Sequence, residues 1–381
     1  MPDPADMPVR VLIITRTPVG GQWRHILDLT DGLLERGFEL GIVVDKLRAS
    51  SYVHETLDRF APRLALGVHA LDMPRLPGWS DITIARQCRS IAKELMADIV
   101  HGHSAKGGLY ARLASAGRPQ KSFYTPHGGS LHYDWSTLGG KVFLSAERAL
   151  MRLGDAYLFE SAYSRDGFRT KIGDPQGRAR VVYNGLRDTE FADGPVWLDE
   201  PDYDFAFVGE MRTIKGVDLV LEALEGLERP DGRKPKVLMF GDGPLLETYK
   251  DMAEELGLAE QVHFAGRQPV RQAFAATNTL LVPSRAESLP YIVMESIAAG
   301  KQVIATDVGG IGEIFGPTRD ALVPSEDVTA LRDAMAASFE RPAGAAQQKI
   351  EDRFAFVRQT FHVDTMVDQV ASAYREILGR A

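Results

Sequence analysis

The chain contains 381 residues, of which 44% are apolar and 25% charged, and it carries a formal net charge of −8. This length exceeds what one ordinary core can organise and predicts two domains. The acidic balance argues against a protein that binds nucleic acid through bulk charge, and the single cysteine, Cys88, excludes an intrachain disulfide framework. The apolar run at 9–14 follows no basic segment and is too short for a signal or membrane span, so we expect a cytoplasmic protein.

Short apolar runs alternate with helical stretches along both halves of the chain. In the first half a helix is predicted at 22–36, and strands at 9–15, 40–44, 99–103, 122–127, 156–160 and 180–183. Residues 188–204, rich in Pro, Gly, Asp and Trp, indicate a linker. Strands then follow at 205–208, 237–240, 262–264, 280–282, 303–305 and 321–323. We therefore expect an α/β protein with two doubly wound parallel sheets, whose ligands bind at the carboxyl ends of the strands.

The segment from Glu287 to Glu295 holds two carboxylates across a predicted loop-to-helix junction. Pro290 suits the first helical position, which places Glu287 in the loop and Glu295 inside the helix. The N–H groups of this helix start, beside Ser288 and Leu289, would suit an anion. A diphosphate there would leave one carboxylate on each side for hydroxyl groups, such as those of a sugar and a ribose. Spacing alone favours the simpler interpretation of one solvated and one partly buried glutamate.

Further candidate residues follow predicted strands of the first half. Gly20 and Gly21 would let backbone N–H groups approach a phosphate or a sugar. His127 also ends a strand, where a lone histidine is more often structural. His101 and His103 would share one face of their strand, so a pair of metal ligands is conceivable, but no third ligand is placed. We prefer a role for His101, His103 and Ser104 on the acceptor side of the site or in packing.

In the second half, Gly209, Arg212 and Lys215 follow the strand at 205–208. The two cations would project beside a helix start, where they could neutralise a diphosphate. Arg267 follows the predicted strand at 262–264. Solvated surface cations are the alternative interpretation of Arg212 and Lys215.

The segment from Pro283 to Glu313 closely resembles the signature of the retaining GT-B glycosyltransferases of family 4. The resemblance covers nearly the whole chain and is strongest between residues 205 and 323. It implies two Rossmann-like domains that face a central cleft, and a UDP- or GDP-linked sugar donor as co-substrate without another cofactor. It implies that the residues closest to the chemistry are His127, Lys215, Arg212 and Glu287. The residues implied in donor binding are Gly20, Gly21, Gly209, Arg267, Ser288, Leu289 and Glu295, with His103 and Ser104 on the acceptor side.

Two departures bear on this resemblance. Glu210 occupies the place where the family commonly has arginine, so the role of Lys215 transfers with more support than that of Arg212. Asp202 and Asp204 fit an Asp-x-Asp metal motif of another glycosyltransferase fold, but they lie in the predicted linker. We expect no metal, because cations, amides and a helix start would take the diphosphate charge.

The resemblance also implies a saccharide or polyprenyl-linked acceptor, in cell-surface polysaccharide or glycolipid assembly. A helix predicted at 139–153, with Lys141, Arg148 and Arg152, could rest peripherally on the inner membrane together with loop 75–79. An ordinary core-facing helix is the alternative. The implied domains are 1–190, with the C-terminal helix 354–381 packed back on it, and 200–353. Two other functions remain open: a nucleotide-sugar epimerase or hydrolase, and a catalytically silent nucleotide-sugar-binding regulator.

Overall fold

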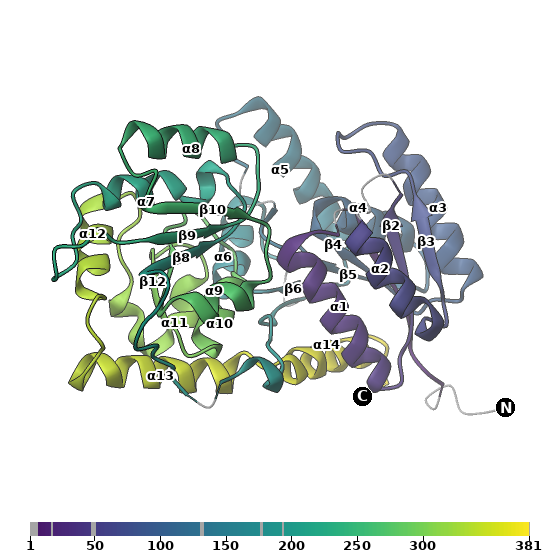
Figure 1. The fold of residues 1–381 in the computed structure, drawn as a ribbon. Helices are drawn as coiled ribbons and strands as arrows, with labels where there is room; N and C mark the ends of the chain where they lie inside the picture. Colours follow the sequence, from purple (N-terminus) through teal and green to yellow (C-terminus); the bar gives the residue numbers. More distant parts are fainter. Residues whose placement is uncertain are drawn as a thin grey trace. The chain divides into compact units, whose positions relative to one another are not determined.

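The computed structural model describes residues 7–16, 18–46, 51–129, 133–175, 178–192 and 194–380. The chain divides into two compact units: unit 1 is Met1–Gly185 with Val363–Ala381, and unit 2 is Leu186–His362. Each unit is built on one parallel sheet with helices on both of its faces (Figure 1).

The sheet of unit 1 has the strand order β3-β2-β1-β4-β5-β6-β7. Its strands are β1 (Arg10–Thr15), β2 (Glu39–Asp45), β3 (Val68–Leu71), β4 (Ile99–His103), β5 (Lys121–Thr125), β6 (Ala156–Phe159) and β7 (Ala179–Val181). Its helices are α1 (Gly20–Glu35), α2 (Ser51–Phe60), α3 (Ser80–Glu94), α4 (Ser104–Ser115), α5 (Leu138–Leu150), α6 (Ala162–Lys171) and α14 (Val363–Ile377). The order reverses between β1 and β4, and the carboxyl ends of these two strands mark the expected ligand position.

Alternate residues of the central strand β1 pack in two different cores of unit 1. Val11 and Ile13 of β1 pack in the core formed with α1 and α14, whereas Leu12 and Ile14 pack in the core formed with α3 and α4. All four side chains are fully buried. This burial on both faces explains why the strand reads as a continuous apolar run.

Helix α14 packs against α1 within unit 1. Val367 and Tyr374 belong to the same core as the buried face of α1, and a Cβ at Gly32 would lie only 2.6 Å from a methyl carbon of Val367. Arg36, at the end of α1, donates to Asp368 over 2.6 Å. The small residue at position 32 therefore permits the close approach of the two helices.

The sheet of unit 2 has the order β10-β9-β8-β11-β12, so its switch point lies between β8 and β11. Its strands are β8 (Phe205–Val208), β9 (Val237–Phe240), β10 (Val262–Gly266), β11 (Thr279–Val282) and β12 (Gln302–Ala305). Its helices are α7 (Val217–Leu224), α8 (Leu246–Glu255), α9 (Val270–Ala276), α10 (Tyr291–Ala298), α11 (Ile311–Phe315), α12 (Val328–Ala337) and α13 (Gly344–Thr360). Phe205 and Phe207 face one core, whereas Ala206 faces the other.

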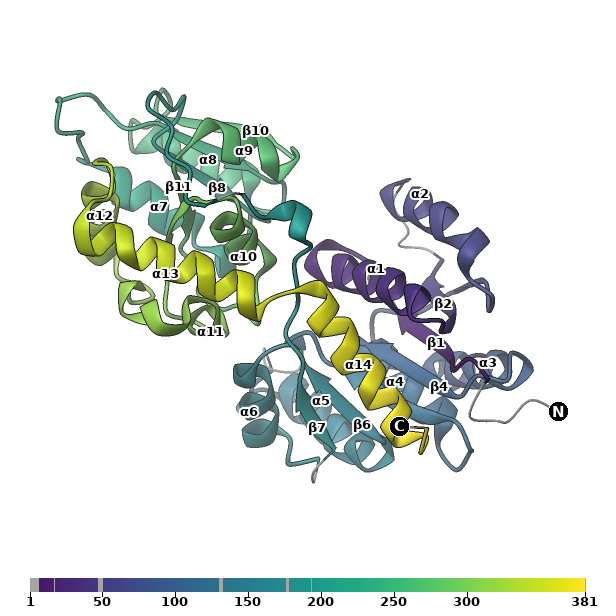
Figure 2. The same cartoon turned by 90° about the horizontal axis from the view of Figure 1, so that it is seen from below.

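Several predicted elements differ from the structure, and two differ most. No strand forms at 321–323, because Ala321 ends a 3-10 segment (Gly316–Ala321) and Val323 makes only an isolated bridge to Thr306. The segment 354–381 is divided between α13 and α14, as Figure 2 shows for these two yellow helices. The break falls at Phe361, which leaves helical geometry at φ −110° and ψ 61°, is fully buried, and accepts a hydrogen bond from the N–H of Leu186 over 2.9 Å.

This break moves the expected domain boundary. The chain passes between the units at Gly185–Leu186 and again at His362–Val363, so residues 354–362 belong to unit 2. Strand β3 was not predicted, since none of its residues is fully buried and Ala70 is exposed at the edge of the sheet. The helix predicted at 139–153 ends at Leu150 and continues as a 3-10 turn, Met151–Leu153.

Candidate active site

The loops after β8 and β11 bring Lys215 and Glu287 together at the switch point of unit 2. Lys215 Nζ donates a hydrogen bond to Oε1 of Glu287 over 2.6 Å, and the hydroxyl of Ser284 donates to the same oxygen over 2.7 Å. The side chains of Lys215 and Glu287 are 26% and 10% exposed. The structure thus places a cation and a partly buried carboxylate side by side where sequence predicted a diphosphate and sugar site.

Two glycines allow the loops after β8 and β12 to approach the loop after β11 closely. Gly216 has φ +69°, and a Cβ there would overlap the carbonyl oxygen of Pro283. Gly309 has φ +59°, and a Cβ there would overlap the carbonyl oxygen of Glu287. Side chains are disfavoured in this left-handed conformation, so glycine serves both the backbone angle and the contact.

Arg285 braces the loops after β8 and β11. Its guanidinium binds both carboxylate oxygens of Asp218 over 2.8 and 2.6 Å, Glu326 over 2.6 Å, and the carbonyl of Thr213 over 2.6 Å. The hydrogen bond to Asp218, followed by the one to Glu326, raises the pKa of Arg285, which keeps it charged. This brace fixes the 3-10 turn Thr213–Lys215 against the loop that carries Glu287.

The other residues of unit 2 that were predicted to bind the donor lie on different elements of the unit. Ser288 and Leu289 precede α10, for which Pro290 is the N-cap residue, and Glu295 lies half-buried within that helix. Gly209 follows β8 and its N–H donates to the carbonyl of Phe240 over 3.0 Å.

The two predicted arginines are exposed and paired with neighbouring acids. Arg212 is 55% exposed, 3.5 Å from Glu210, and Arg267 is 81% exposed, 3.8 Å from Asp242. Within the part of the chain that the structure describes, neither guanidinium forms a hydrogen bond or an ion pair with Lys215 or Glu287.

At the switch point of unit 1, a hydrogen-bond chain fixes the start of α1 and α4. Ser104 Oγ donates to Oε1 of Gln22 over 2.6 Å, and Gln22 Nε2 donates to Oγ1 of Thr15 over 2.8 Å. Gly20 and Gly21 form the first, exposed turn of α1. Ser104 (φ +57°) and His127 (φ +50°) are two of the four non-glycine residues with left-handed backbone in the described chain. Such conformations concentrate at functional sites, where the surroundings hold them.

A buried histidine cluster lies beside these hydrogen bonds. It consists of His25 of α1, His103 at the end of β4 and His127 after β5. His127 Nδ1 is 3.0 Å from Oε2 of Glu160, and His127 Nε2 is 2.9 Å from Nδ1 of His103. His25 Nδ1 is 2.8 Å from Oδ1 of Asn184, whose amide nitrogen is 3.4 Å from the same oxygen of Glu160. Both ring nitrogens of His127 therefore have partners inside unit 1.

Burial keeps most of these imidazoles neutral. It lowers the pKa of His25 to about 3, with the nearby His127 acting in the same direction and Glu160 opposing it. Burial also lowers the pKa of His101 and His103 well below 6.5, and the neighbouring histidines add to the shift. These three rings therefore act at neutral pH as hydrogen-bonding groups, each with one donor and one acceptor nitrogen.

The conceivable metal pair of His101 and His103 is not supported. The two rings do share a face, with centroids 4.2 Å apart. However, His101 Nδ1 bonds the hydroxyl of Tyr374 over 2.6 Å and His101 Nε2 bonds the hydroxyl of Thr125 over 2.9 Å, so both its nitrogens are occupied. His101 thus has the packing role that was the preferred alternative.

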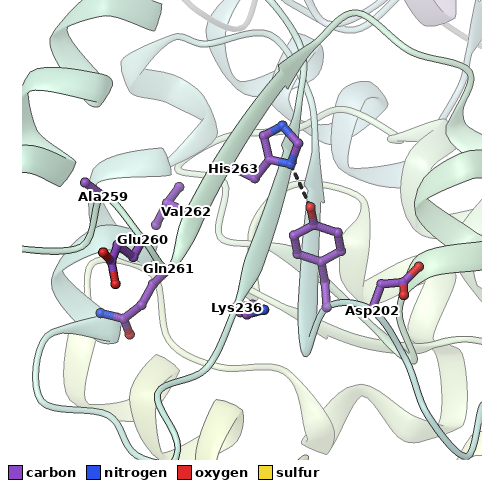
Figure 3. A pocket seen from close by; sticks show the side chains of 8 residues that line it. Asp202, Lys236, Ala259, Glu260, Gln261, Val262 and His263 are labelled. Atoms are coloured by element: carbon purple, nitrogen blue, oxygen red, sulfur yellow. Dashed lines mark hydrogen bonds between the residues drawn. The ribbon is translucent and has the colours of Figure 1, made fainter.

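A pocket lies at the opposite edge of the unit 2 sheet, among the residues that the structure describes. It has a volume of about 530 Å³ and is lined by Asp202, Tyr203, Lys236, Ala259, Glu260, Gln261, Val262 and His263. Figure 3 shows this pocket. The hydroxyl of Tyr203 lies within hydrogen-bond distance of Nδ1 of His263, at 2.6 Å. These residues lie at the amino ends of β8, β9 and β10, whereas ligands of such sheets bind at the carboxyl ends.

The Asp-x-Asp motif belongs to this amino edge as well. Asp204 pairs with Arg229 and accepts a hydrogen bond from the N–H of Lys236 over 2.8 Å. Its carboxylate therefore has a structural role, away from the Lys215–Glu287 pair.

Sequence reasoning did not identify His25, Glu160 or Asn184 as parts of one site. Glu160 directly follows β6, Asn184 follows β7, and His25 lies on the buried face of α1. Polar residues at the carboxyl ends of predicted strands were a usable signal for Glu160 and Asn184. A histidine among the apolar positions of the first helix was a weaker one for His25.

Comparisons with known proteins agree with this architecture. Residues 189–353 match the family model for glycosyl transferases group 1, and residues 19–190 match that for glycosyltransferase family 4. A D-inositol 3-phosphate glycosyltransferase of Gordonia bronchialis is 30% identical over 226 residues, which cover 56% of this chain and 48% of that protein. A GDP-mannose-dependent alpha-(1-6)-phosphatidylinositol monomannoside mannosyltransferase of Mycolicibacterium smegmatis is 26% identical over 371 residues, covering 90% of this chain and 92% of that protein.

Solved structures show the same fold. HepE from Anabaena, in complex with UDP, has a TM-score of 0.78 at 17% identity and covers 97% of this chain and 100% of that one. Sucrose-phosphate synthase from Thermosynechococcus elongatus has a TM-score of 0.78 at 18% identity, with coverage of 98% and 100%. Each unit carries the parallel-sheet architecture of a GT-B fold, and the two family matches run consecutively along residues 19–353. The chain therefore belongs to the glycosyltransferases of group 1 and family 4.

Proposed function

We propose that the protein transfers a sugar, with retention of configuration, from a UDP- or GDP-linked donor to a saccharide or lipid-linked saccharide acceptor. The observation that carries the proposal is the Lys215–Glu287 pair at the switch point of unit 2. A nucleotide-sugar needs a cation for its diphosphate and hydrogen-bond acceptors for its sugar hydroxyls. Lys215 supplies the cation and Glu287 supplies the acceptor, and the two side chains are hydrogen-bonded to each other.

The chemistry of the pair suits a bound donor. The ammonium of Lys215 has three N–H donors, and Glu287 accepts only one of them, which leaves two for phosphate oxygens. Both hydrogen bonds that Glu287 receives go to Oε1, so Oε2 can accept from a sugar hydroxyl. The N-terminal N–H groups of α10 add partial positive charge beside them. These groups would compensate the diphosphate charge without a metal ion.

The proposed mechanism relies on positioning and charge. In the retaining reaction that the family resemblance implies, the acceptor attacks the same face of the sugar from which the diphosphate leaves. The donor phosphate assists removal of the acceptor proton. Lys215 would then stabilise the charge that develops on the leaving diphosphate, a role that pre-placed donors perform efficiently.

The acceptor class rests on relatives and on the surface of unit 1. The two relatives described above are named for an inositol phosphate and for a phosphatidylinositol mannoside. Unit 1 exposes large apolar side chains on its carboxyl-edge loops and at the start of α5: Leu76 (76%), Trp79 (89%), Leu138 (82%) and Val142 (66%). No helix within the described ranges is long and apolar enough to cross a membrane. This rim, with Lys141 beside it, would rest on an anionic bilayer and reach a lipid-linked acceptor.

Ligand-dependent melting tests the donor. A panel of UDP-, GDP- and ADP-sugars should raise the melting temperature with one nucleotide preferred, because binding to the native state stabilises it. Slow hydrolysis of the preferred donor would show turnover without an acceptor. No stabilisation by any sugar nucleotide would contradict the proposal, and conversion of the donor to an isomeric nucleotide-sugar would replace transfer by epimerisation.

Vesicle sedimentation tests the membrane contact. Wild-type protein should pellet with vesicles that contain anionic phospholipid and should stay in solution with zwitterionic ones. The Trp79→Ser/Leu138→Ser variant should lose this binding while keeping its donor-dependent stabilisation. Equal sedimentation of both proteins would contradict the apolar rim as the contact.

A further inference from the structure

Glu160 is a buried carboxylate that links two members of the hydrogen-bonded histidine cluster, His127 directly and His25 through Asn184. Its Oε2 faces Nδ1 of His127 at 3.0 Å and the amide nitrogen of Asn184 at 3.4 Å. The residue is 6% exposed. An ionised carboxylate can only accept hydrogen bonds, so both neighbours must donate to it.

This requirement sets the direction of each hydrogen bond that follows. His127 must carry its proton on Nδ1, so in the neutral ring Nε2 is an acceptor. His103 Nδ1, 2.9 Å from that nitrogen, must then be a donor. Asn184, which donates through its amide nitrogen, accepts through Oδ1 from Nδ1 of His25. One carboxylate thus selects the tautomer of three imidazoles.

The series of hydrogen bonds that starts at Glu160 ends at Nε2 of His103, a buried nitrogen without a partner among the described residues. His103 is fully buried, and its Nε2 has no hydrogen-bond partner among the residues that the structure describes. With Nδ1 as the donor, Nε2 of the neutral ring is an unprotonated lone pair. Buried N–H groups without a partner are rarer than under-satisfied acceptors, so an orphaned acceptor at this position agrees with the direction derived from Glu160.

A cation held by the cluster is the competing interpretation. His25, His103 and His127 each offer a ligand atom within 4.8 Å of the others. Two imidazole nitrogens that ligate one tetrahedral zinc ion at about 2.0–2.1 Å lie about 3.3 Å apart. The His103–His127 separation of 2.9 Å is instead that of a hydrogen bond, which uses the lone pair a metal would need. The observations therefore favour the hydrogen-bonded chain.

We propose that Glu160 is a positioning residue that holds His127 as its Nδ1–H tautomer and so presents His127 Nε2 as an acceptor for a hydroxyl of the transferred sugar. The sugar hydroxyl would enter this hydrogen bond by donating to His127 Nε2 while its oxygen accepts from His103 Nδ1–H, so that the buried N–H keeps a partner. This role rests on the proposed transfer function, because it assigns the direction of one donor-sugar contact. It also explains why the left-handed backbone of His127 is tolerated, since the ring is held at both nitrogens.

The test combines a direct reading of the tautomer with kinetics. In protein labelled with ¹⁵N-histidine and studied without ligand at neutral to mildly alkaline pH, His127 should show a protonated Nδ1 and an unprotonated Nε2. Glu160→Gln keeps the shape but offers an amide donor, so His127 should shift toward the Nε2–H tautomer. Its kcat for transfer should fall on the order of tenfold or more, with the KM for the donor changed little. Glu94→Gln, an exposed acid on α3, is the matched control and should change neither reading.

Each outcome decides the proposal. An Nε2–H tautomer or an imidazolium for His127 in the wild type would overturn it, and this reading stands even if Glu160→Gln fails to fold. An unchanged tautomer and kcat in a folded Glu160→Gln protein would overturn it as well. Stoichiometric binding of Zn²⁺ alone, lost in His25→Asn, would replace the chain by a metal centre. If the wild type shows the Nδ1–H tautomer but transfers no sugar, the transfer function fails while the hydrogen-bond assignment holds.

Discussion

Acid should destabilise unit 1 through its buried histidines, and His25 allows the effect to be calculated. Burial lowers the pKa of His25 from 6.5 to about 3. The folded protein therefore binds fewer protons at this ring than the unfolded chain does. The stability that results is fully present above pH 6.5 and is lost progressively as the pH falls toward 3. The groups facing His25 are the imidazoles of His103 and His127, with Glu160 reached through Asn184.

The magnitude follows from linkage. Between about pH 7.5 and about pH 5, a single site with these two pKa values lowers the free energy of unfolding by about 2 kcal/mol. His101 and His103 are shifted in the same direction by burial, so they add to the loss. Replacing His25 by Asn removes one titrating ring. The variant should be less stable than the wild type at neutral pH, because the hydrogen bond to Asn184 is lost, but its stability should fall by about 2 kcal/mol less on acidification.

Urea unfolding at a series of pH values measures this difference. Trp23, 1% exposed and hydrogen-bonded to Thr56, lies next to His25 on α1 and reports on unit 1. The comparison is cleanest in a background where the other three of the four tryptophans are phenylalanine. His54→Asn, which removes an exposed histidine of α2, is the matched control and should follow the wild-type curve. If His25→Asn and wild type lose the same free energy between the two pH values, His25 is not held neutral by burial and the reasoning fails.

Four further measurements address the two sites. Lys215→Ala should slow transfer at least tenfold, because a charge-assisted contact to phosphate contributes about 1.5–3 kcal/mol, and an unchanged rate would remove Lys215 from the mechanism. Activity should survive EDTA, whereas complete loss that added metal restores would require a metal-dependent mechanism. Calorimetry should show that Glu295→Ala weakens binding of the free nucleotide and that Glu287→Ala affects the sugar nucleotide more; equal losses for both ligands in both variants would rule out this division. Tyr374→Phe should lower the free energy of unfolding by about 1–3 kcal/mol, since it leaves Nδ1 of His101 unbonded in the core, and an unchanged urea midpoint would contradict that.

Local pattern was sufficient for most of the architecture. The strand at 99–103 and those at 205–208 and 237–240 have the predicted bounds, because a buried parallel strand is a short apolar run and its ends are set by adjacent turn residues. The sequence also placed Lys215 in the loop after the strand at 205–208 and Glu287 in the loop after the strand predicted at 280–282. Their pairing depends on β8 and β11 being neighbours, which the sheet order supplies.

Other features depended on contacts that no local pattern encodes. Phe361 interrupts the last helical stretch because its side chain is buried and its carbonyl pairs with Leu186, far away in the sequence. Arg212 and Arg267 have the right residue type for a phosphate, yet each is exposed and beside its own acid. A sequence motif specifies where such an arginine stands in the chain. The direction in which its side chain points is set by the packing around it.

The histidine cluster shows the same division most clearly. The sequence by itself predicted that His103 and His127 end consecutive strands and that a helix containing His25 follows the first strand. In the structure β5 ends at Thr125, two residues before His127. Only the tertiary structure decided that these rings, Glu160 and Asn184 meet, because they come from α1 and from the ends of β4, β5, β6 and β7. Periodicity specifies which face of an element is buried. It does not specify which polar groups from distant elements will converge there, since that follows from strand order and helix rotation together.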